Sequence, residues 1–235
     1  MTASIFRLSV PRNLALHQHR FDNTTGVAPY FFMNFSFPKQ LLNAVEYRKM
    51  EFFAGRFCAF QALMALRGIP FAPIGMSEDR SPIWPSGIVG AITHSEGIAL
   101  AVVGEDKNYR GIGIDIERKL SHAHACQLSR QVLSPGETWQ KWGSTHEFSL
   151  LITLIFSLKE SLFKALHPEV KRFFGFNSAK VIDIDWSGKR FSVMLTETLS
   201  PLYRQGGEFS GQFDIQKDYV ATLLTVDRRE SLRVV

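Results

Sequence analysis

The chain has 235 residues, of which 45% are hydrophobic and 21% are charged, as in ordinary globular proteins and unlike disordered chains. Lysine and arginine number 27 against 22 aspartates and glutamates, and the net charge of +5 favours an anionic partner without specifying its kind. Two cysteines are too few for a disulfide framework or a cysteine-rich zinc site, so both are excluded.

Signals for membrane insertion or secretion are absent from the sequence. The longest strongly apolar stretch without charge, residues 148–158, is far shorter than a membrane-spanning helix. Charged residues interrupt the first twenty positions, where a signal peptide would have a continuous apolar segment. We therefore expect a cytoplasmic protein with no membrane partner, and the dispersed positive charges argue against a nucleic-acid-binding tail.

The N-terminal half of the chain predicts one long helix followed by short strands. After about forty irregular or strand-like residues, apolar side chains recur at helical spacing from Lys39 to Arg67, and Gly68 and Pro70 act as stop signals. A turn-rich segment, 70–87, comes next. Three strands are then predicted, and the turns between them favour adjacent antiparallel pairing: 88–93, 98–103 and 111–117.

The C-terminal half repeats this order of a helix and then strands. A polar stretch at 121–143 precedes a second helix at 148–166, in which leucine and isoleucine follow helical spacing. Four strands follow: 179–186, 191–196, 209–215 and 219–226. The predicted class is α+β, with two similar halves, 1–110 and 111–235, related by a pseudo-twofold axis, each a long helix packed on a mainly antiparallel sheet.

Segment 111–117, with the sequence Gly-Ile-Gly-Ile-Asp-Ile-Glu, is the most informative in the chain. Side chains of a strand alternate between its faces, so the isoleucines share one face while Gly113, Asp115 and Glu117 share the other. Two carboxylates, with a glycine leaving space beside them, form a hard-oxygen site suited to Mg²⁺. The alternative is a strand with a merely solvated polar face.

Segment 156–164, with the sequence Phe-Ser-Leu-Lys-Glu-Ser-Leu-Phe-Lys, places two charged residues on one side of the second helix. Glu160 and Lys164 are four residues apart and therefore share a face, away from the apolar stripe of this helix. The alternative is an ordinary surface ion pair that slightly stabilises the helix.

Four cationic residues are candidates for binding an anion. His94 ends an apolar strand just before a turn, where it either binds a phosphate or serves as a structural histidine. Arg48 and Arg56 lie on the same broad side of the first helix, about two turns apart, and Arg80 lies on a loop. Scattered arginines are usually solvated, so these residues form an anion site only if they converge.

Taken in this order, the segments resemble the Sfp-type phosphopantetheinyl transferases, in particular the branch similar to enterobactin synthase component D. The resemblance runs from about Arg48 to the C-terminus and rests on five stretches: 48–56, 79–87, 92–95, 111–117 and 156–164. Each late motif is weak alone, and the combination with the preceding arginine and histidine segments makes the resemblance specific. Thr93 stands where the family more often has serine.

The resemblance implies a monomer with the 4′-phosphopantetheinyl transferase fold, which holds coenzyme A in the cleft between its halves. By position, the implied magnesium ligands are Asp115, Glu117 and Glu160. The implied ligands of the coenzyme A phosphates, the 3′-phosphate included, are Arg48, Arg56, Arg80 and His94. Asp115 faces the pyrophosphate through the metal, and Lys164 adds positive charge beside it.

The implied reaction transfers 4′-phosphopantetheine from coenzyme A to a serine of an apo acyl or peptidyl carrier protein, with Mg²⁺, releasing 3′,5′-ADP. The catalytic residues would be Glu160, as the base acting directly or through a water, and Lys164. Such carriers are acidic helical bundles, which suits the net positive charge, and segment 171–174 is a candidate docking surface. Siderophore, polyketide and fatty-acid carriers are equally compatible with these motifs.

Two other functions compete with this interpretation. A Mg²⁺-dependent phosphohydrolase acting on coenzyme A or a nucleotide would use the same carboxylates with water as the nucleophile. A basic nucleic-acid-binding module would explain the charge, but the dispersed positive residues and the lack of a binding motif argue against it.

Overall fold

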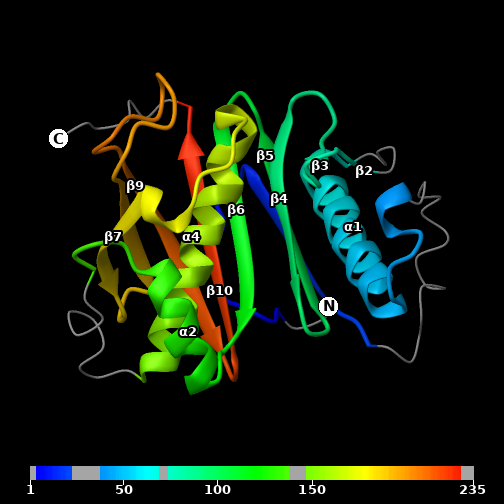
Figure 1. The fold of residues 1–235 in the computed structure, drawn as a ribbon. Coiled ribbons are helices and arrows are strands. Elements are labelled where there is room, and N and C mark those ends of the chain that lie inside the picture. Colours follow the sequence, from blue (N-terminus) through cyan, green and yellow to red (C-terminus); the bar gives the residue numbers. More distant parts are fainter. Residues whose placement is uncertain (1–3, 23–37, 69–73, 138–146, 229–235) are drawn as a thin grey trace.

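The structure, a computed structural model, describes residues 4–22, 38–68, 74–137 and 147–228. Two antiparallel sheets each carry a long helix, and a small two-stranded ribbon lies beside the first (Figure 1). None of the helices in these ranges combines the length and the apolarity needed to cross a membrane. Residues 70–73 of the turn-rich segment lie outside the described residues.

The N-terminal sheet has the strand order β1, β5, β4, with every pair antiparallel. Its strands are β1 (Leu14–Arg20), β4 (Ile88–Ser95) and β5 (Ile98–Glu105). Helix α1 (Glu46–Arg67) covers one face of this sheet, and Ala99, Ala101 and Val103 of β5 pack under it. The separate ribbon pairs β2 (Gly75–Met76) with β3 (Pro82–Ile83).

Helix α1 ends where the sequence predicts but begins later. Gly68 caps it with a φ of 70°, a left-handed conformation that glycine adopts without strain. The predicted start at Lys39 is wrong, because Lys39–Leu41 forms a separate 3₁₀ turn, η2. Val45 then takes an extended conformation, with φ −60° and ψ 152°, which interrupts the helical path.

The C-terminal sheet has five antiparallel strands in the order β6, β10, β9, β8, β7. Its strands are β6 (Tyr109–Arg118), β7 (Ala179–Asp185), β8 (Arg190–Leu195), β9 (Glu208–Gln216) and β10 (Tyr219–Asp227). Helix α4 (Phe148–Val170) covers this sheet, α2 (His122–Val132) packs against α4, and a 3₁₀ turn, η3 (Phe176–Ser178), leads into β7.

Two predictions for this region are corrected. Strand β6 does not continue the β4–β5 pair but forms the edge of the second sheet, because its isoleucine face is buried between the sheets. The polar stretch at 121–143 contains helix α2, capped by the Ser121 hydroxyl, which accepts a hydrogen bond from the His124 N–H. Only Ala125 and Val132 of α2 are buried, so its apolar periodicity is too weak to see in the sequence.

The predicted α+β class is confirmed, and each part has a long helix on an antiparallel sheet. The two sheets differ in size, with three strands in the first and five in the second. The boundary at residue 110 stays a prediction, although β6 lies wholly within the second sheet.

The two sheets meet along β4 and β6, which lie side by side in the centre of Figure 1. Leu100 and Val102 of β5 pack there against the isoleucines of β6, in a core shared by both sheets. The N-terminal segment strengthens this junction, because the Arg7 N–H donates to Asp214 Oδ2 on β9 at 2.8 Å. The polar end of β6 is therefore fixed against the N-terminal sheet.

Helix α4 approaches β6 closely because small residues face one another. Ser157, Ser161 and Ala165 recur at every fourth position and so share one side of α4. Gly111 and Gly113 of β6 lie opposite, and a Cβ atom on either would overlap a carbonyl oxygen of α4. The space beside the carboxylates that the sequence suggested for a metal is thus filled at Gly113 by the helix backbone.

Candidate active site

A buried hydroxyl joins the two parts of the molecule at the β4–β6 junction. Thr93 Oγ1 on β4 donates to Asp115 Oδ1 at 3.2 Å and accepts from the Ile116 N–H at 3.2 Å. Thr93 is 4% exposed and Asp115 3% exposed, so this end of β6 is not a solvated polar face. The alternative interpretation of segment 111–117, a strand with a merely solvated polar face, is therefore wrong.

Lys164 brings a positive charge from α4 to the same carboxylate. Its Nζ lies 2.7 Å from Asp115 Oδ1 and donates to the Ile114 carbonyl at 3.1 Å. Among the described residues the ion-pair partner of Lys164 is Asp115 rather than Glu160, so the predicted alternative of a surface pair within the helix is also wrong. The close approach of α4 to β6 is what allows this contact.

The remaining two carboxylates have pKa values above their ordinary range. Burial is the largest cause at Glu117 and raises its pKa to about 8, with the Asp115 charge adding to the effect and Lys164 opposing it. Burial, followed by the Asp115 charge, also raises the pKa of Glu160, again against Lys164. Acidic groups that raise one another's pKa form a site at which a cation is favoured.

The donors at this site are of the kind that magnesium prefers, although they do not enclose an ion. Asp115 Oδ2 is buried and has no hydrogen-bond partner among the described residues, and it belongs to a group of hard carboxylate oxygens. In the same ranges, no three His, Cys, Asp or Glu side chains converge closely enough to enclose an ion. Lys164 contacts the other oxygen of Asp115. The charge of Asp115 acts on both Glu117 and Glu160, so the three carboxylates are near one another without being closed around a centre.

Arg48 and His94 meet where α1 passes β4. Arg48 Nη1 lies 2.9 Å from His94 Nε2 and donates to Glu51 Oε2 at 3.0 Å. His94 Nδ1 lies 3.4 Å from Glu51 Oε1, so the carboxylate contacts both cationic side chains. Two of the four predicted phosphate ligands, Arg48 and His94, therefore converge. Glu51, which the sequence did not indicate as a site residue, lies with them.

Arg56 is placed differently from its neighbour on α1. Its guanidinium is buried, with Nε donating to the Ile74 carbonyl at 2.9 Å and Nη2 to the Gly75 carbonyl at 3.1 Å. It also stacks over the Phe52 ring, and burial lowers its pKa to about 10. In this structure Arg56 tethers the segment before β2 and does not join Arg48, so its phosphate role stays a prediction.

Arg80 lies in an exposed turn with a φ of 69°. The neighbouring Asp79 accepts hydrogen bonds from both Ser77 and Ser81 and lies 3.8 Å from His167 Nδ1 on α4. The turn therefore extends from the N-terminal part to the same helix that carries Glu160 and Lys164. Among the described residues no hydrogen bond joins Arg80 to Arg48, Arg56 or His94, so its phosphate role stays a prediction.

A buried ion pair lies on the opposite side of α4. Lys159 Nζ lies 2.8 Å from Glu137 Oε2 and also donates to the Val132 and Phe176 carbonyls, at 2.8 and 3.2 Å. Both charged side chains are almost fully buried, and Glu137 in turn accepts from the Val181 N–H. The network fixes the loop before β7 against α4.

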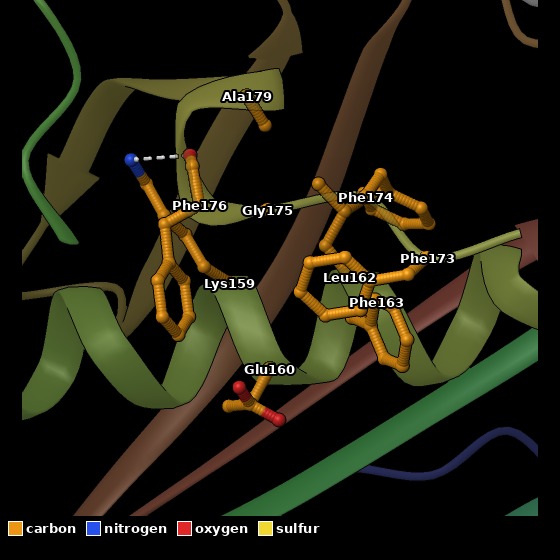
Figure 2. A pocket seen from close by; sticks show the side chains of 9 residues that line it. All are labelled: Lys159, Glu160, Leu162, Phe163, Phe173, Phe174, Gly175, Phe176 and Ala179. Carbon is orange, nitrogen blue, oxygen red and sulfur yellow. Dashed lines mark hydrogen bonds between the residues drawn. The ribbon is translucent and has the colours of Figure 1, made fainter. Parts of the chain in front are cut away.

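Figure 2 shows the side chains of Lys159 and Glu160 leaving α4 in opposite directions beside a mainly aromatic pocket. Phe163, Phe174 and Phe176 line this pocket, and Lys159 donates to the Phe176 carbonyl beside it. The pocket thus lies next to the carboxylate cluster but is apolar in character.

Several of these residues could not be found from the sequence. Glu51 lies one helical turn after Arg48, which is the only signal it offers. Nothing in the sequence indicates that Thr93 crosses to β6, since that contact depends on two sheets meeting. Glu137 stands in a polar stretch and carries no visible sign of being buried against Lys159.

Two family models match the chain. A 4′-phosphopantetheinyl transferase N-terminal domain model matches residues 37–104, and a 4′-phosphopantetheinyl transferase superfamily model matches residues 111–224. The second match contains Asp115, Glu117, Glu160 and Lys164, and the first contains Arg48 and His94.

Curated relatives carry names from the same group. The chain is 39% identical over 145 residues to enterobactin synthase component D of Salmonella typhimurium. This alignment covers 62% of the chain and 59% of the Salmonella protein. It is 34% identical over 188 residues to the Escherichia coli K12 protein of the same name, covering 80% and 82%. It is 30% identical over 222 residues to the 4′-phosphopantetheinyl transferase PptT of Mycobacterium tuberculosis, covering 89% and 92%.

Thr93→Val should destabilise the fold, because Asp115 Oδ1 loses a hydrogen-bond donor and the Ile116 N–H loses its acceptor. The expected cost is about 1–3 kcal/mol, or a fall in Tm of about 2–4 °C per kcal/mol for a chain of this size. Thermal unfolding followed by circular dichroism measures the change. Thr93→Ser, which keeps the hydroxyl, is the control, and equal stability of the two variants would contradict the bridging role.

Proposed function

The chain belongs to the 4′-phosphopantetheinyl transferase superfamily, and from that premise we propose that it transfers the 4′-phosphopantetheine group of coenzyme A to a serine of an apo acyl or peptidyl carrier protein. Adenosine 3′,5′-bisphosphate would be the second product. The match to the Salmonella relative spans 59% of that protein's length, so the activity, substrates and partners are proposed for this chain rather than transferred to it.

The observation that carries the proposal is the buried Asp115 at the junction of the two sheets. It faces the Lys164 ammonium at 2.7 Å, and its charge acts on both Glu117 and Glu160. A cluster of carboxylates with one cation suits a reaction in which the charge of a pyrophosphate has to be neutralised. No such cluster is required of a protein that only binds a carrier.

Magnesium is the cofactor we propose for this site, held by Asp115, Glu117 and Glu160. When bound, it would neutralise charge on the pyrophosphate that Lys164 alone cannot balance. The buried Asp115 Oδ2 without a described partner supports this assignment, as does the raised pKa of Glu117.

Glu160 is proposed as the base that accepts the proton of the carrier serine, directly or through a water. Its raised pKa brings it closer to neutral pH, where a general base is most effective. The serine oxygen then bonds to the β-phosphorus of coenzyme A, and the bond from that phosphorus to the bridging oxygen breaks. Lys164 stabilises the charge that develops on the leaving adenosine 3′,5′-bisphosphate.

The phosphates of coenzyme A, the 3′-phosphate included, are proposed to bind Arg48 and His94, with Arg80 and Arg56 as further candidates. The convergence of Arg48 and His94 at 2.9 Å supports the first two. The aromatic pocket beside Glu160 would accept the uncharged pantetheine arm, since it offers apolar walls next to the carboxylates.

The carrier protein is proposed to dock on segment 171–174. The Phe173 side chain is 80% exposed there, and Lys171 and Arg172 beside it are exposed cations. An acidic helical carrier would complement these charges while covering the phenylalanine ring. Phe173 and Glu160 line the same pocket, so a docked serine would be near Glu160.

We also propose that the protein works as a cytoplasmic monomer. The monomer is what the resemblance to the Sfp-type enzymes implies. The two free cysteines, one buried and one exposed, suit a reducing compartment.

The proposal is tested by intact-mass spectrometry of an apo acyl or peptidyl carrier incubated with the protein, coenzyme A and Mg²⁺. We expect the carrier to gain the mass of one phosphopantetheine group and to gain nothing when EDTA replaces the metal. Consumption of coenzyme A without carrier would instead indicate a phosphohydrolase. A failure to modify both carrier types, despite measurable coenzyme A binding, would contradict the proposal.

Glu160→Gln should lower the rate of carrier modification by at least about 10²-fold, because the side chain can no longer accept the serine proton. Binding of coenzyme A, followed by calorimetry, should change far less, since Arg48 and His94 remain. Glu147→Gln, at the exposed start of the same helix, is the matched control and should leave the rate unchanged. A Glu160→Gln protein with wild-type turnover would rule out Glu160 as the base.

A further inference from the structure

Glu51 contacts two residues of the proposed phosphate site, although a negative charge there opposes the binding of an anion. Its Oε2 accepts from Arg48 Nη1 at 3.0 Å, and its Oε1 lies 3.4 Å from His94 Nδ1. If Glu51 only repelled the phosphate, it would weaken binding. Whether it weakens or strengthens binding therefore depends on where it lies relative to Arg48 and His94.

The exposure of the three side chains places the acid behind the cations. The Arg48 side chain is 45% exposed and that of His94 is 24% exposed, whereas that of Glu51 is only 13% exposed. An anion arriving from solvent therefore meets Arg48 and His94 first. Glu51 contacts both of them from the more buried side.

The bonding pattern fixes how His94 is held. Arg48 can only donate, so His94 Nε2 accepts from it and the imidazole proton lies on Nδ1. This buried atom lies 3.4 Å from Glu51 Oε1 and has no hydrogen-bond partner among the described residues. Burial acts to raise the pKa of Glu51, but its interactions with His94 and Arg48 outweigh that effect, so the pKa is lowered.

The strand geometry separates this cluster from the reacting centre. Thr93 faces Asp115, and the next residue, His94, faces α1, as expected for neighbours on a strand. A single pyrophosphate contacting Asp115 through its cation would not also occupy the opposite side of β4. The phosphate left for Arg48 and His94 is the 3′-monoester of coenzyme A.

We propose that Glu51 is a positioning residue for the 3′-phosphate of coenzyme A: it orients Arg48 and His94 without touching the phosphate itself. This inference rests on the proposed function. A carboxylate placed in this way favours the binding of an anion. Two observations support this effect: Glu51 is less exposed than Arg48 and His94, and it accepts a hydrogen bond from Arg48.

The test compares coenzyme A with 3′-dephospho-coenzyme A as substrates of the wild type and of Glu51→Gln. Loss of one charge-assisted contact should raise KM for coenzyme A about tenfold, with kcat nearly unchanged. The KM for the dephospho substrate should be the same in both proteins. Glu46→Gln, an exposed acid on the same helix that pairs with Lys49, is the matched control and should behave as wild type.

Calorimetry with adenosine 3′,5′-bisphosphate and adenosine 5′-monophosphate separates this inference from the proposed function, because neither titration needs transfer to occur. Glu51→Gln should weaken binding of the bisphosphate about tenfold and leave that of the monophosphate unchanged. Tighter binding of the bisphosphate would show that Glu51 only repels anions. An equal loss for both nucleotides, or no loss, would equally overturn the positioning role, whatever the transfer assay gives.

Discussion

The contact between α4 and β6 is the constraint on which the rest of the site depends. Gly111 and Gly113 have no side chains to hold the helix away, so the backbone of α4 rests directly against the strand at Ser161 and Ala165. Lys164 lies within the same turns and for that reason reaches Asp115 at 2.7 Å. A larger residue on β6 or on α4 at this contact would move Lys164 away from Asp115. Segments 111–117 and 156–164, which are about forty residues apart in the sequence, would then no longer meet.

The site also depends on the junction of the two sheets. Asp115 lies on the edge strand of one sheet, and the hydroxyl of Thr93 on the edge strand of the other holds it. The next residue of β4, His94, faces α1 and meets Arg48 there. Two neighbouring positions of one strand thus connect the carboxylate cluster with the cationic cluster. This arrangement suits a ligand with two separate phosphate groups, which is why coenzyme A is a better proposed substrate than a simple monophosphate.

Much of the fold follows from local patterns in the sequence, whereas much of the site does not. The end of α1 at Gly68, the strand segments and the shared face of Glu160 and Lys164 follow from periodicity and turn residues, which act over a few positions. The placement of β6 in the second sheet, the buried pair of Lys159 with Glu137 and the contact of Thr93 with Asp115 all join distant segments. Such contacts depend on which faces become buried, and no local spacing encodes them.

The most direct test of this account is the thermal stability and transfer rate of Gly113→Ala, measured beside Gly175→Ala. A Cβ at Gly113 would overlap the Ser161 carbonyl, whereas one at Gly175 meets nothing within 4 Å. We expect Gly113→Ala to be destabilised by about 1–3 kcal/mol or more and to lose most of its transfer rate, while Gly175→Ala remains as stable as wild type. A Gly113→Ala protein that matches wild type in both stability and rate would contradict the claim that this contact builds the site.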